Sequence, residues 1–169
     1  MQVQKTKLEG VLLITHAGFE DFRGNFDEVY NRDLYEKNGI TVNFVQDNTS
    51  VTHQFVLRGI HGGSETWKLI TCLEGRLYFV AVNCDEASKD FGKWESFILS
   101  DVNRHQVLVP PKFGNAHLVL SDIDIFSYKQ SQYYDPKDQF TYKWNDPKFN
   151  IWWPIADPII SLRDEQGHF

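Results

Sequence analysis

Short apolar runs separated by turn residues recur along most of the chain, and this spacing constrains the fold more than any other feature. The runs begin roughly every eight to twelve residues, which is typical of β-sandwiches and barrels. The pattern predicts an all-β fold, a double-sheet barrel of the jelly-roll type with short peripheral helices. In such barrels a ligand binds in the mouth between the sheets. A chain of 169 residues is expected to form a single domain over residues 1–169.

Apolar alternation and turn residues also place the individual elements. The expected strands lie at 1–17, with 11–14 as the centre, at 40–51, at two apolar runs within 55–83, and at 92–99, 106–109, 116–120 and 125–129. Short helices are expected at 29–38 and 161–166, turns at 19–28 and 110–114, and a loop region at 133–147. Within 40–51, the side chains of Gln46, Asn48 and Ser50 share one face of the strand.

Charge and cysteine content exclude several classes of protein. The net charge of −6 argues against a broad nucleic-acid surface, so an anionic ligand needs a local basic pocket. Cys72 and Cys84 are too few for a disulfide framework and lie in apolar surroundings, so we expect buried free thiols in a reducing cytosol. No signal-like segment and no run of about twenty apolar residues occurs, so we expect a cytoplasmic protein that is not inserted in a membrane.

The stretch 55–79 carries the most informative cluster of side chains. It brings Arg58, His61 and Lys68 close together in sequence, and these groups suit an anionic ligand and proton transfer. Alternation puts Arg58 and His61 on opposite faces of a strand unless Gly59 forms a bulge. Plainer interpretations are a structural histidine and a lysine whose ammonium reaches solvent. If Lys68 is buried, its ammonium needs a partner, and a developing oxyanion is one.

Other polar residues also have two interpretations each. Gln46, Asn48 and Arg58 suit a wall that binds a phosphate or a sugar, but polar residues on a sheet face are commonly just solvated. Most tyrosines, Tyr128 among them, simply pack with the hydroxyl in water.

The sequence does not favour a metal site or a familiar hydrolase or nucleotide motif. His61 and His117 could be two metal ligands, but a third is missing, so no metal is expected. GxSxG, P-loop and GxGxxG patterns are absent, so hydrolase, NTPase and dinucleotide-binding interpretations lack support.

The order and spacing of short motifs between residues 19 and 164 resemble one known family, the dTDP-4-dehydrorhamnose 3,5-epimerases and related nucleotide-sugar epimerases. The motifs are Asp21-Phe22-Arg23-Gly24, Gln46-Asp47-Asn48-Thr49-Ser50, Leu57-Arg58-Gly59-Ile60-His61, Trp67-Lys68-Leu69, Phe91-Gly92-Lys93-Trp94, Trp144-Asn145-Asp146-Pro147, Trp153-Pro154 and Ser161-Leu162-Arg163-Asp164. The resemblance implies a jelly-roll cupin without a metal or an organic cofactor. It also implies a homodimer with strands exchanged between subunits.

The resemblance further implies an activity and the residues that carry it. The substrate is a nucleoside-diphosphate 4-keto-6-deoxy sugar, whose ketone acidifies the protons at C3 and C5. His61 is then the base, oriented by Asp164, Lys68 stabilises the enolate oxygen, and Tyr128 is the opposing acid. The implied substrate contacts are Arg23, Gln46, Asn48, Arg58, Asn115, His117 and Tyr134.

Several positions depart from the family's usual pattern. They are Gly62-Gly63 for a Tyr-Gln pair, Asn115 for a histidine, Asn83 for an acidic residue, Asp85 for an arginine, and Gln139-Phe140 for a Glu-Arg pair. These changes fall where the family contacts the sugar and the nucleotide, so the nucleotide can be dTDP or GDP. The set resembles a sub-branch that includes epimerases of GDP-linked 4-keto heptoses.

The sequence therefore predicts an epimerase that inverts C3, C5 or both of a nucleotide-linked 4-keto sugar through an enolate. Its role would be in the synthesis of bacterial surface polysaccharide, capsule or lipopolysaccharide. Two alternatives on the same scaffold are a 3,4-ketoisomerase, which moves the carbonyl, and a sugar-nucleotide-binding cupin without catalysis.

Overall fold

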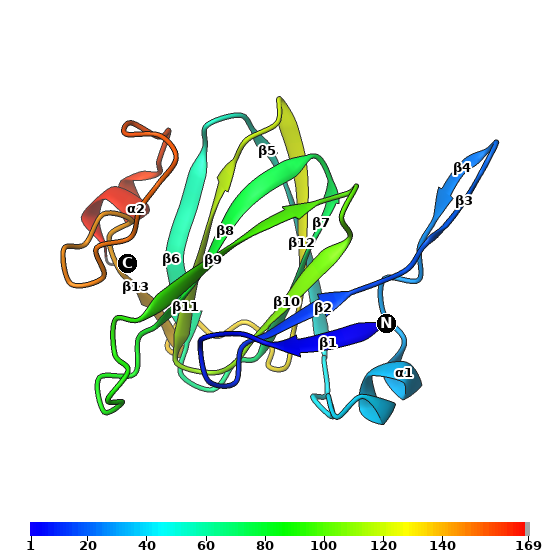
Figure 1. Ribbon diagram of the computed structural model, residues 1–169. Helices are drawn as coiled ribbons and strands as arrows, with labels where there is room; N and C mark the ends of the chain where they lie inside the picture. The colour runs from blue at the N-terminus through cyan, green and yellow to red at the C-terminus, as the bar shows by residue number, and fades with distance from the viewer. Residues whose placement is uncertain (168–169) are drawn as a thin grey trace.

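Two antiparallel sheets face each other and form a barrel in the computed structural model, which describes residues 1–167 of the chain (Figure 1). The last two residues of the expected domain lie outside the described residues. The strands are β1 (Gln2–Lys5), β2 (Leu12–Thr15), β3 (Phe19–Asp21), β4 (Gly24–Phe26), β5 (Gln46–His53), β6 (Leu57–Gly63), β7 (Lys68–Glu74), β8 (Arg76–Asn83), β9 (Trp94–Ser100), β10 (His105–Val109), β11 (Phe113–Val119), β12 (Ile123–Gln130) and β13 (Gln139–Thr141). The helices are α1 (Arg32–Lys37) and α2 (Leu162–Gln166).

The strand order is that of two sheets connected by crossovers. One sheet has six strands in the order β1-β2-β10-β7-β12-β5, and the other has five in the order β13-β6-β11-β8-β9. Strands β3 and β4 form a separate hairpin that projects away from the barrel (Figure 1). The predicted all-β jelly-roll architecture with short peripheral helices is confirmed, and both helices lie within their expected ranges.

Several boundaries differ from the expectation, and the turn expected at 19–28 contains the hairpin β3–β4. The single strand expected at 1–17 is the hairpin β1–β2, and the strand expected at 40–51 begins only at Gln46. Residues 40–44 lie outside the strand because the apolar side chains of Ile40, Val42 and Phe44 pack with Tyr35 of helix α1 instead, and only the Val45 N–H already donates to Gln130 O at 2.9 Å. The turn expected at 110–114 ends earlier, since Phe113 already pairs with Asn83. The loop region 133–147 contains the short strand β13, which pairs with β6.

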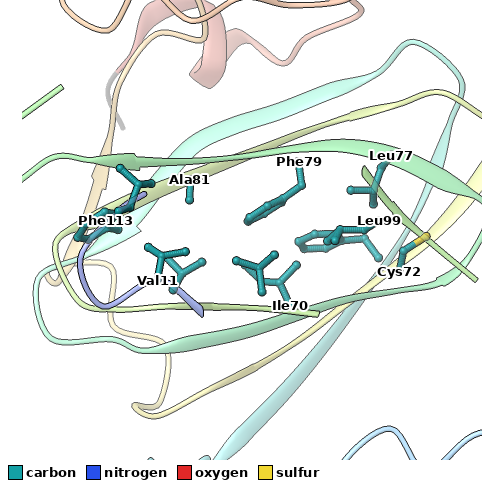
Figure 2. Packing of buried hydrophobic residues seen from close by; sticks show 12 residues of the cluster. Val11, Ile70, Cys72, Leu77, Phe79, Ala81, Leu99 and Phe113 are labelled. Atoms are coloured by element: carbon teal, nitrogen blue, oxygen red, sulfur yellow. The ribbon is translucent and has the colours of Figure 1, made fainter. Parts of the chain in front are cut away.

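The main apolar core fills one part of the space between the sheets. Leu77, Phe79 and Ala81 point inward from β8 and meet Ile70 and Cys72 of β7 (Figure 2). Strand β8 is also buried on its outer face, where Tyr78 and Val80 pack against the C-terminal segment. Burial on both faces explains why β8 is a continuous apolar run.

The outer face of the six-stranded sheet is only partly covered. Tyr35 of α1 packs there with Ile14, Leu69 and Leu108.

Cys72 and Cys84 are buried free thiols, as predicted. In the described part of the chain, no helix is long and apolar enough to cross a membrane.

Candidate active site

A cavity of about 230 Å³ lies between the two sheets, beside the apolar core. Its lining comes from both sheets, from the segment around β13 and from α2. The lining residues are Ser50, Arg58, His61, Lys68, Asn115, His117, Phe126, Tyr128, Gln130, Tyr134, Gln139 and Arg163. Polar and cationic side chains therefore replace apolar ones on the inner faces at this place.

Arg58 and His61 both reach this cavity because β6 contains a bulge. His61 pairs with Asn115 and Arg58 pairs with His117, so β6 holds one residue more than β11 over this stretch. Gly59 has a φ of +127°, where L side chains are strained. Strand alternation alone could not decide whether a bulge occurs at Gly59. The structure has this bulge, and it turns the side chains of Arg58 and His61 to one side.

His61 forms a close pair with Asp164. The distance between His61 Nε2 and Asp164 Oδ1 is 2.5 Å, although the two residues are 103 positions apart in the chain. Asp164 lies in the first turn of α2, where its N–H donates to the N-cap Ser161 Oγ at 3.2 Å. Its other oxygen accepts the Gly59 N–H at 3.4 Å. The bulge and the helix start thereby hold the carboxylate against the ring.

The surroundings of Asp164 keep it ionised. Burial alone raises the pKa of this carboxyl, but the hydrogen bond and charge of His61, with the Gly59 and Ser161 contacts, bring it below its ordinary value. An ionised Asp164 can only accept a hydrogen bond from Nε2, so that nitrogen carries the hydrogen. His61 Nδ1 is then the nitrogen that can take a proton from a ligand.

Lys68 is buried, with 8% of its surface exposed. Its ammonium donates to Asn115 Oδ1 at 3.2 Å and lies 5.7 Å from the centre of the Tyr128 ring. Burial lowers the pKa of Lys68 to about 8, together with repulsion from Arg163 and against the attraction of Asp138. A buried ammonium with one neutral acceptor is able to stabilise an oxyanion that develops beside it.

Tyr128 lines the same cavity as His61 but comes from the opposite sheet. Burial, with a smaller effect of Tyr134, raises the pKa of the Tyr128 phenol, so its hydroxyl keeps its proton. An imidazole and a phenol therefore face the cavity from opposite walls. This arrangement can remove a proton on one side of a ligand and return one on the other.

The amide side chains predicted as substrate contacts form a network beside the cavity. Gln46 Nε2 donates to Asn48 Oδ1 at 2.9 Å, and Gln46 Oε1 accepts the N–H of Tyr134 at 3.0 Å. Asn48 Nδ2 is buried and has no hydrogen-bond partner among the described residues. Ser50, on the same strand face, lines the cavity, so the predicted common face of these residues is confirmed.

His117 and Asn115 lie on the inner face of β11. The His117 ring stacks on Phe126 with 4.0 Å between ring centres and 12° between planes. Burial, followed by repulsion from Arg58 and His61, lowers the pKa of His117 to about 3, so its imidazole is neutral.

Arg23 is the one predicted contact that its own chain does not bring near the cavity. It lies between β3 and β4 and pairs with Asp21 at 2.6 Å, with 77% of its side chain exposed. The hairpin that carries it projects from the barrel (Figure 1). Arg23 is not among the described residues that line the cavity.

Five lining residues had no predicted role. Ser50, Phe126 and Gln130 share a strand face with predicted residues, so the alternation that placed Asn48 and Tyr128 could have found them. Arg163 precedes Asp164 and donates to Thr141 Oγ1 at 2.7 Å. Gln139 lies in a strand too short to show a pattern. Within the part of the chain that the structure describes, no group of three or more His, Cys, Asp or Glu is placed to hold a metal ion.

A jelly-roll barrel with a histidine–aspartate pair, a buried lysine and an opposed tyrosine defines a cupin enzyme built for proton transfer. The sequence profile of the family described as dTDP-4-dehydrorhamnose 3,5-epimerase matches residues 5–169. The chain belongs to this family of isomerases.

Relatives from several organisms agree with this assignment. The dTDP-4-dehydrorhamnose 3,5-epimerase of Escherichia coli K12 is 40% identical, over 98% of this chain and 92% of that protein. The dTDP-4-dehydrorhamnose 3-epimerase of Streptomyces niveus is 33% identical, over 99% and 83%. The crystal structure of the dTDP-6-deoxy-D-glucose-3,5-epimerase of Legionella pneumophila, in complex with dTDP-4-keto-L-rhamnose, has a TM-score of 0.90 at 35% identity and covers 96% of this chain and 89% of that one.

Proposed function

We propose that the protein inverts C3, C5 or both of a nucleoside-diphosphate 4-keto sugar for the synthesis of surface polysaccharide. The observation that carries this proposal is the cavity in which the His61–Asp164 pair and Tyr128 face each other from opposite sheets. The ketone at C4 makes the protons at its neighbouring carbons acidic. Removing one of them on one face and returning a proton on the other inverts the centre.

The steps balance without any external co-reactant. His61 Nδ1 takes the proton from C3 or C5, and the electron pair of the C–H bond moves to the C4 oxygen as an enolate. The ammonium of Lys68, which has 8% of its surface exposed, stabilises that oxygen. The enolate then collapses to the ketone while the carbon takes the proton of the Tyr128 hydroxyl. Exchange with solvent restores both groups.

The anionic diphosphate has cationic partners at the cavity. Arg58 and Arg163 both line it, and the amide network of Gln46 and Asn48 lies beside it. We assign Asn115, His117 and Tyr134 to contacts with the sugar. The solved Legionella pneumophila relative is in complex with a dTDP-linked sugar, which supports dTDP, whereas the departures at residues 62–63 and 139–140 leave GDP as the competing nucleotide.

We infer that the working unit is a homodimer in which hairpin β3–β4 of one protomer reaches the cavity of the other. Phe19, Phe22 and Phe26 on this hairpin are 78%, 98% and 73% exposed, and contiguous exposed aromatic surface marks a site of association. Two hollows of about 320 and 500 Å³ lie on the outer face of the six-stranded sheet, where Leu73 is exposed. A second copy would cover both features and bring its Arg23 to the diphosphate. A nucleotide-sugar substrate and two buried free thiols support a cytoplasmic location.

Solvent deuterium exchange tests the proposal. Wild type and a His61→Asn variant are incubated in deuterated water with a panel of dTDP- and GDP-linked 4-keto sugars, and NMR follows deuterium at C3 and C5. We expect exchange by the wild type and a loss of roughly 10²- to 10⁴-fold in the variant. The matched control is His53→Asn at an exposed position of β5, which should exchange at the wild-type rate.

The outcomes of this assay distinguish the role of His61, the two alternative functions and the carbon that reacts. If His61→Asn exchanges at the wild-type rate, the assignment of His61 as the base is wrong. Tight binding without exchange by the wild type indicates a binding protein, and migration of the carbonyl indicates a ketoisomerase. The position and inversion of the labelled carbon show whether one centre or both react.

A further inference from the structure

Asp124 is a buried carboxyl group that the proposed chemistry does not use. It lies on β12 with 0% of its surface exposed, and neither of its oxygens has a hydrogen-bond partner among the described residues. Burial raises its pKa to about 7, partly offset by the positive charge of Arg58. Because burying an unpaired carboxylate is costly, such a group points to a function that depends on its charge.

Thr52 is a neighbour of both Asp124 and Arg58. Asp124 and Thr52 are directly opposed in the pairing of β12 with β5, so both side chains leave the sheet on the same face. Arg58 Nε donates to Thr52 Oγ1 at 3.2 Å, and Thr52 is 2% exposed. The described structure has no hydrogen bond between Thr52 and Asp124. A hydroxyl that accepts one hydrogen bond still has a proton to donate, so Thr52 is the group that could donate to an ionised Asp124 while it accepts from Arg58.

Asp124 does not itself reach the cavity. Phe126, two residues further along the same strand face, lines the cavity and stacks with His117. Any effect of Asp124 on a ligand is therefore indirect, and Arg58 is the charged cavity residue that senses Asp124.

The surroundings hold few other groups that could compensate the charge. The titratable side chains closest to Asp124 in the strand pairing and in the chain are Cys72 and Glu74 on β7, His53 on β5 and Asp122 in the preceding turn. Arg58 on β6 acts on Asp124 through its charge, and Arg76 follows Gly75, which lies against the Asp124 backbone. Glu74, His53, Asp122 and Arg76 are exposed. Burial, followed by the negative charge of Asp124, raises the pKa of the Cys72 thiol to about 12, so the thiol stays neutral. Arg58 is left as the cation that responds to Asp124.

We propose that Asp124 is a positioning residue for Arg58. Ionised Asp124 holds the guanidinium on the cavity wall through Thr52, and protonated Asp124 releases it to the anionic part of a ligand. This inference relies on the proposed function only in taking a diphosphate as that anion.

Anion binding at Arg58 and protonation of Asp124 are thermodynamically linked. A ligand that draws Arg58 toward itself removes the positive charge that supports ionised Asp124, so binding is accompanied by proton uptake. By reciprocity, the affinity for the anion falls as pH rises through the titration of Asp124. A change of one unit in this pKa on binding corresponds to a roughly tenfold change in affinity between low and high pH.

Calorimetric titrations with dTDP, GDP and inorganic pyrophosphate at pH 6 and pH 8.5, each in two buffers of different ionisation enthalpy, test this inference. Asp124→Asn and wild type should bind equally at pH 6. At pH 8.5 the variant should bind roughly threefold to tenfold more tightly and take up fewer protons. Ionisation of the probe and of the other cavity groups is common to both proteins and cancels in the comparison.

Three further variants keep the test decisive. Asp124→Ala replaces Asp124→Asn if the amide prevents folding, and it should behave in the same way. Thr52→Val keeps the carboxyl but removes the link, so it should reduce the pH effect. Asp122→Asn changes an exposed carboxylate in the preceding turn and should match the wild type.

Two results overturn the inference: an equal pH dependence and equal proton uptake in wild type and both Asp124 variants, or no binding of any probe to the wild type. Failure of the proposed function is seen separately, as absence of deuterium exchange. An enzyme that exchanges normally but lacks the Asp124 effect keeps its function and loses only this inference.

Discussion

At the scale of single residues, the charge of Lys68 governs the proposed reaction, because the positive charge stabilises the enolate oxygen. Burial, with repulsion from Arg163, lowers the pKa of Lys68 to about 8, so the charged form is lost as pH rises through that value. We predict that kcat/KM for exchange, which reports the free enzyme, falls by about tenfold per pH unit above roughly pH 8. Lys68→Met should lower the rate by roughly 10²- to 10³-fold.

An arginine variant separates charge from structure in this pH test. Lys68→Arg keeps its charge at high pH, so its residual activity should lack the alkaline decline. The exposed Lys93, which pairs with Asp90, provides the control, and Lys93→Met should follow the wild-type profile. A flat kcat/KM between pH 7 and 9.5 in the wild type would contradict the role of Lys68.

The same scale shows which site residues a sequence can reveal. Lys68 lies within an apolar run, so its burial could be predicted from its neighbours. Asp164 has no local signal, because it meets His61 across 103 positions through the start of α2. Only the resemblance to a known family identified Asp164 as a site residue. Asp124 stands between two isoleucines on a strand, and nothing in that pattern tells a buried carboxyl from a solvated one.

At the scale of elements, the bulge of β6 decides whether Arg58 and His61 share a cavity. A Cβ added at Gly59 would lie 2.4 Å from the Ala116 Cβ, and the φ of +127° is strained for any L side chain. We predict that Gly59→Ala lowers the free energy of unfolding by roughly 2–5 kcal/mol, measured by denaturant titration. The folded fraction should also lose most of its exchange activity, because the bulge aims both side chains.

The control for this prediction is a glycine with strain but with space. Gly39 has a φ of +83° and nothing within 4 Å of an added Cβ, so Gly39→Ala should cost only about 1 kcal/mol and leave exchange unchanged. Equal effects of the two substitutions would mean that the contact with Ala116 is not what requires glycine.

Elements were predictable where one face is apolar and the other polar. Strand β5 shows this alternation, and the common face of Gln46, Asn48 and Ser50 followed from it. Residues 40–45 also alternate, but their apolar side chains cover helix α1 instead of joining the sheet. Alternation with a period of two cannot distinguish a paired strand from a segment that packs on a helix. It also reveals neither a bulge nor a strand as short as the three residues of β13.

At the scale of the whole molecule, strand spacing was enough to predict two sheets enclosing one cavity. It could not show how the space between the sheets is divided between an apolar core and a polar site. The division depends on cross-strand neighbours. Ile70 and Cys72 on β7 belong to the apolar core, whereas the residues opposite them on β12, Tyr128 and Phe126, line the cavity. The outward position of hairpin β3–β4 was equally hidden, because an exposed aromatic hairpin has the same local sequence pattern as a packed one.

Mixing two impaired variants tests whether this hairpin completes the site of a second copy. Arg23→Ala should lower exchange by roughly tenfold if its guanidinium contacts the diphosphate, and His61→Asn should lower it by roughly 10²- to 10⁴-fold. A heterodimer of the two variants has one site with neither defect if the hairpins are exchanged, since one chain supplies His61 and the other Arg23. Equal amounts, unfolded and refolded together, should therefore recover about a quarter of the wild-type activity. If each hairpin serves its own barrel, every site keeps one defect, and mixing should add nothing to the residual activity of Arg23→Ala. The proteins mixed without unfolding give the baseline, and their molecular mass in solution reports whether a dimer forms at all.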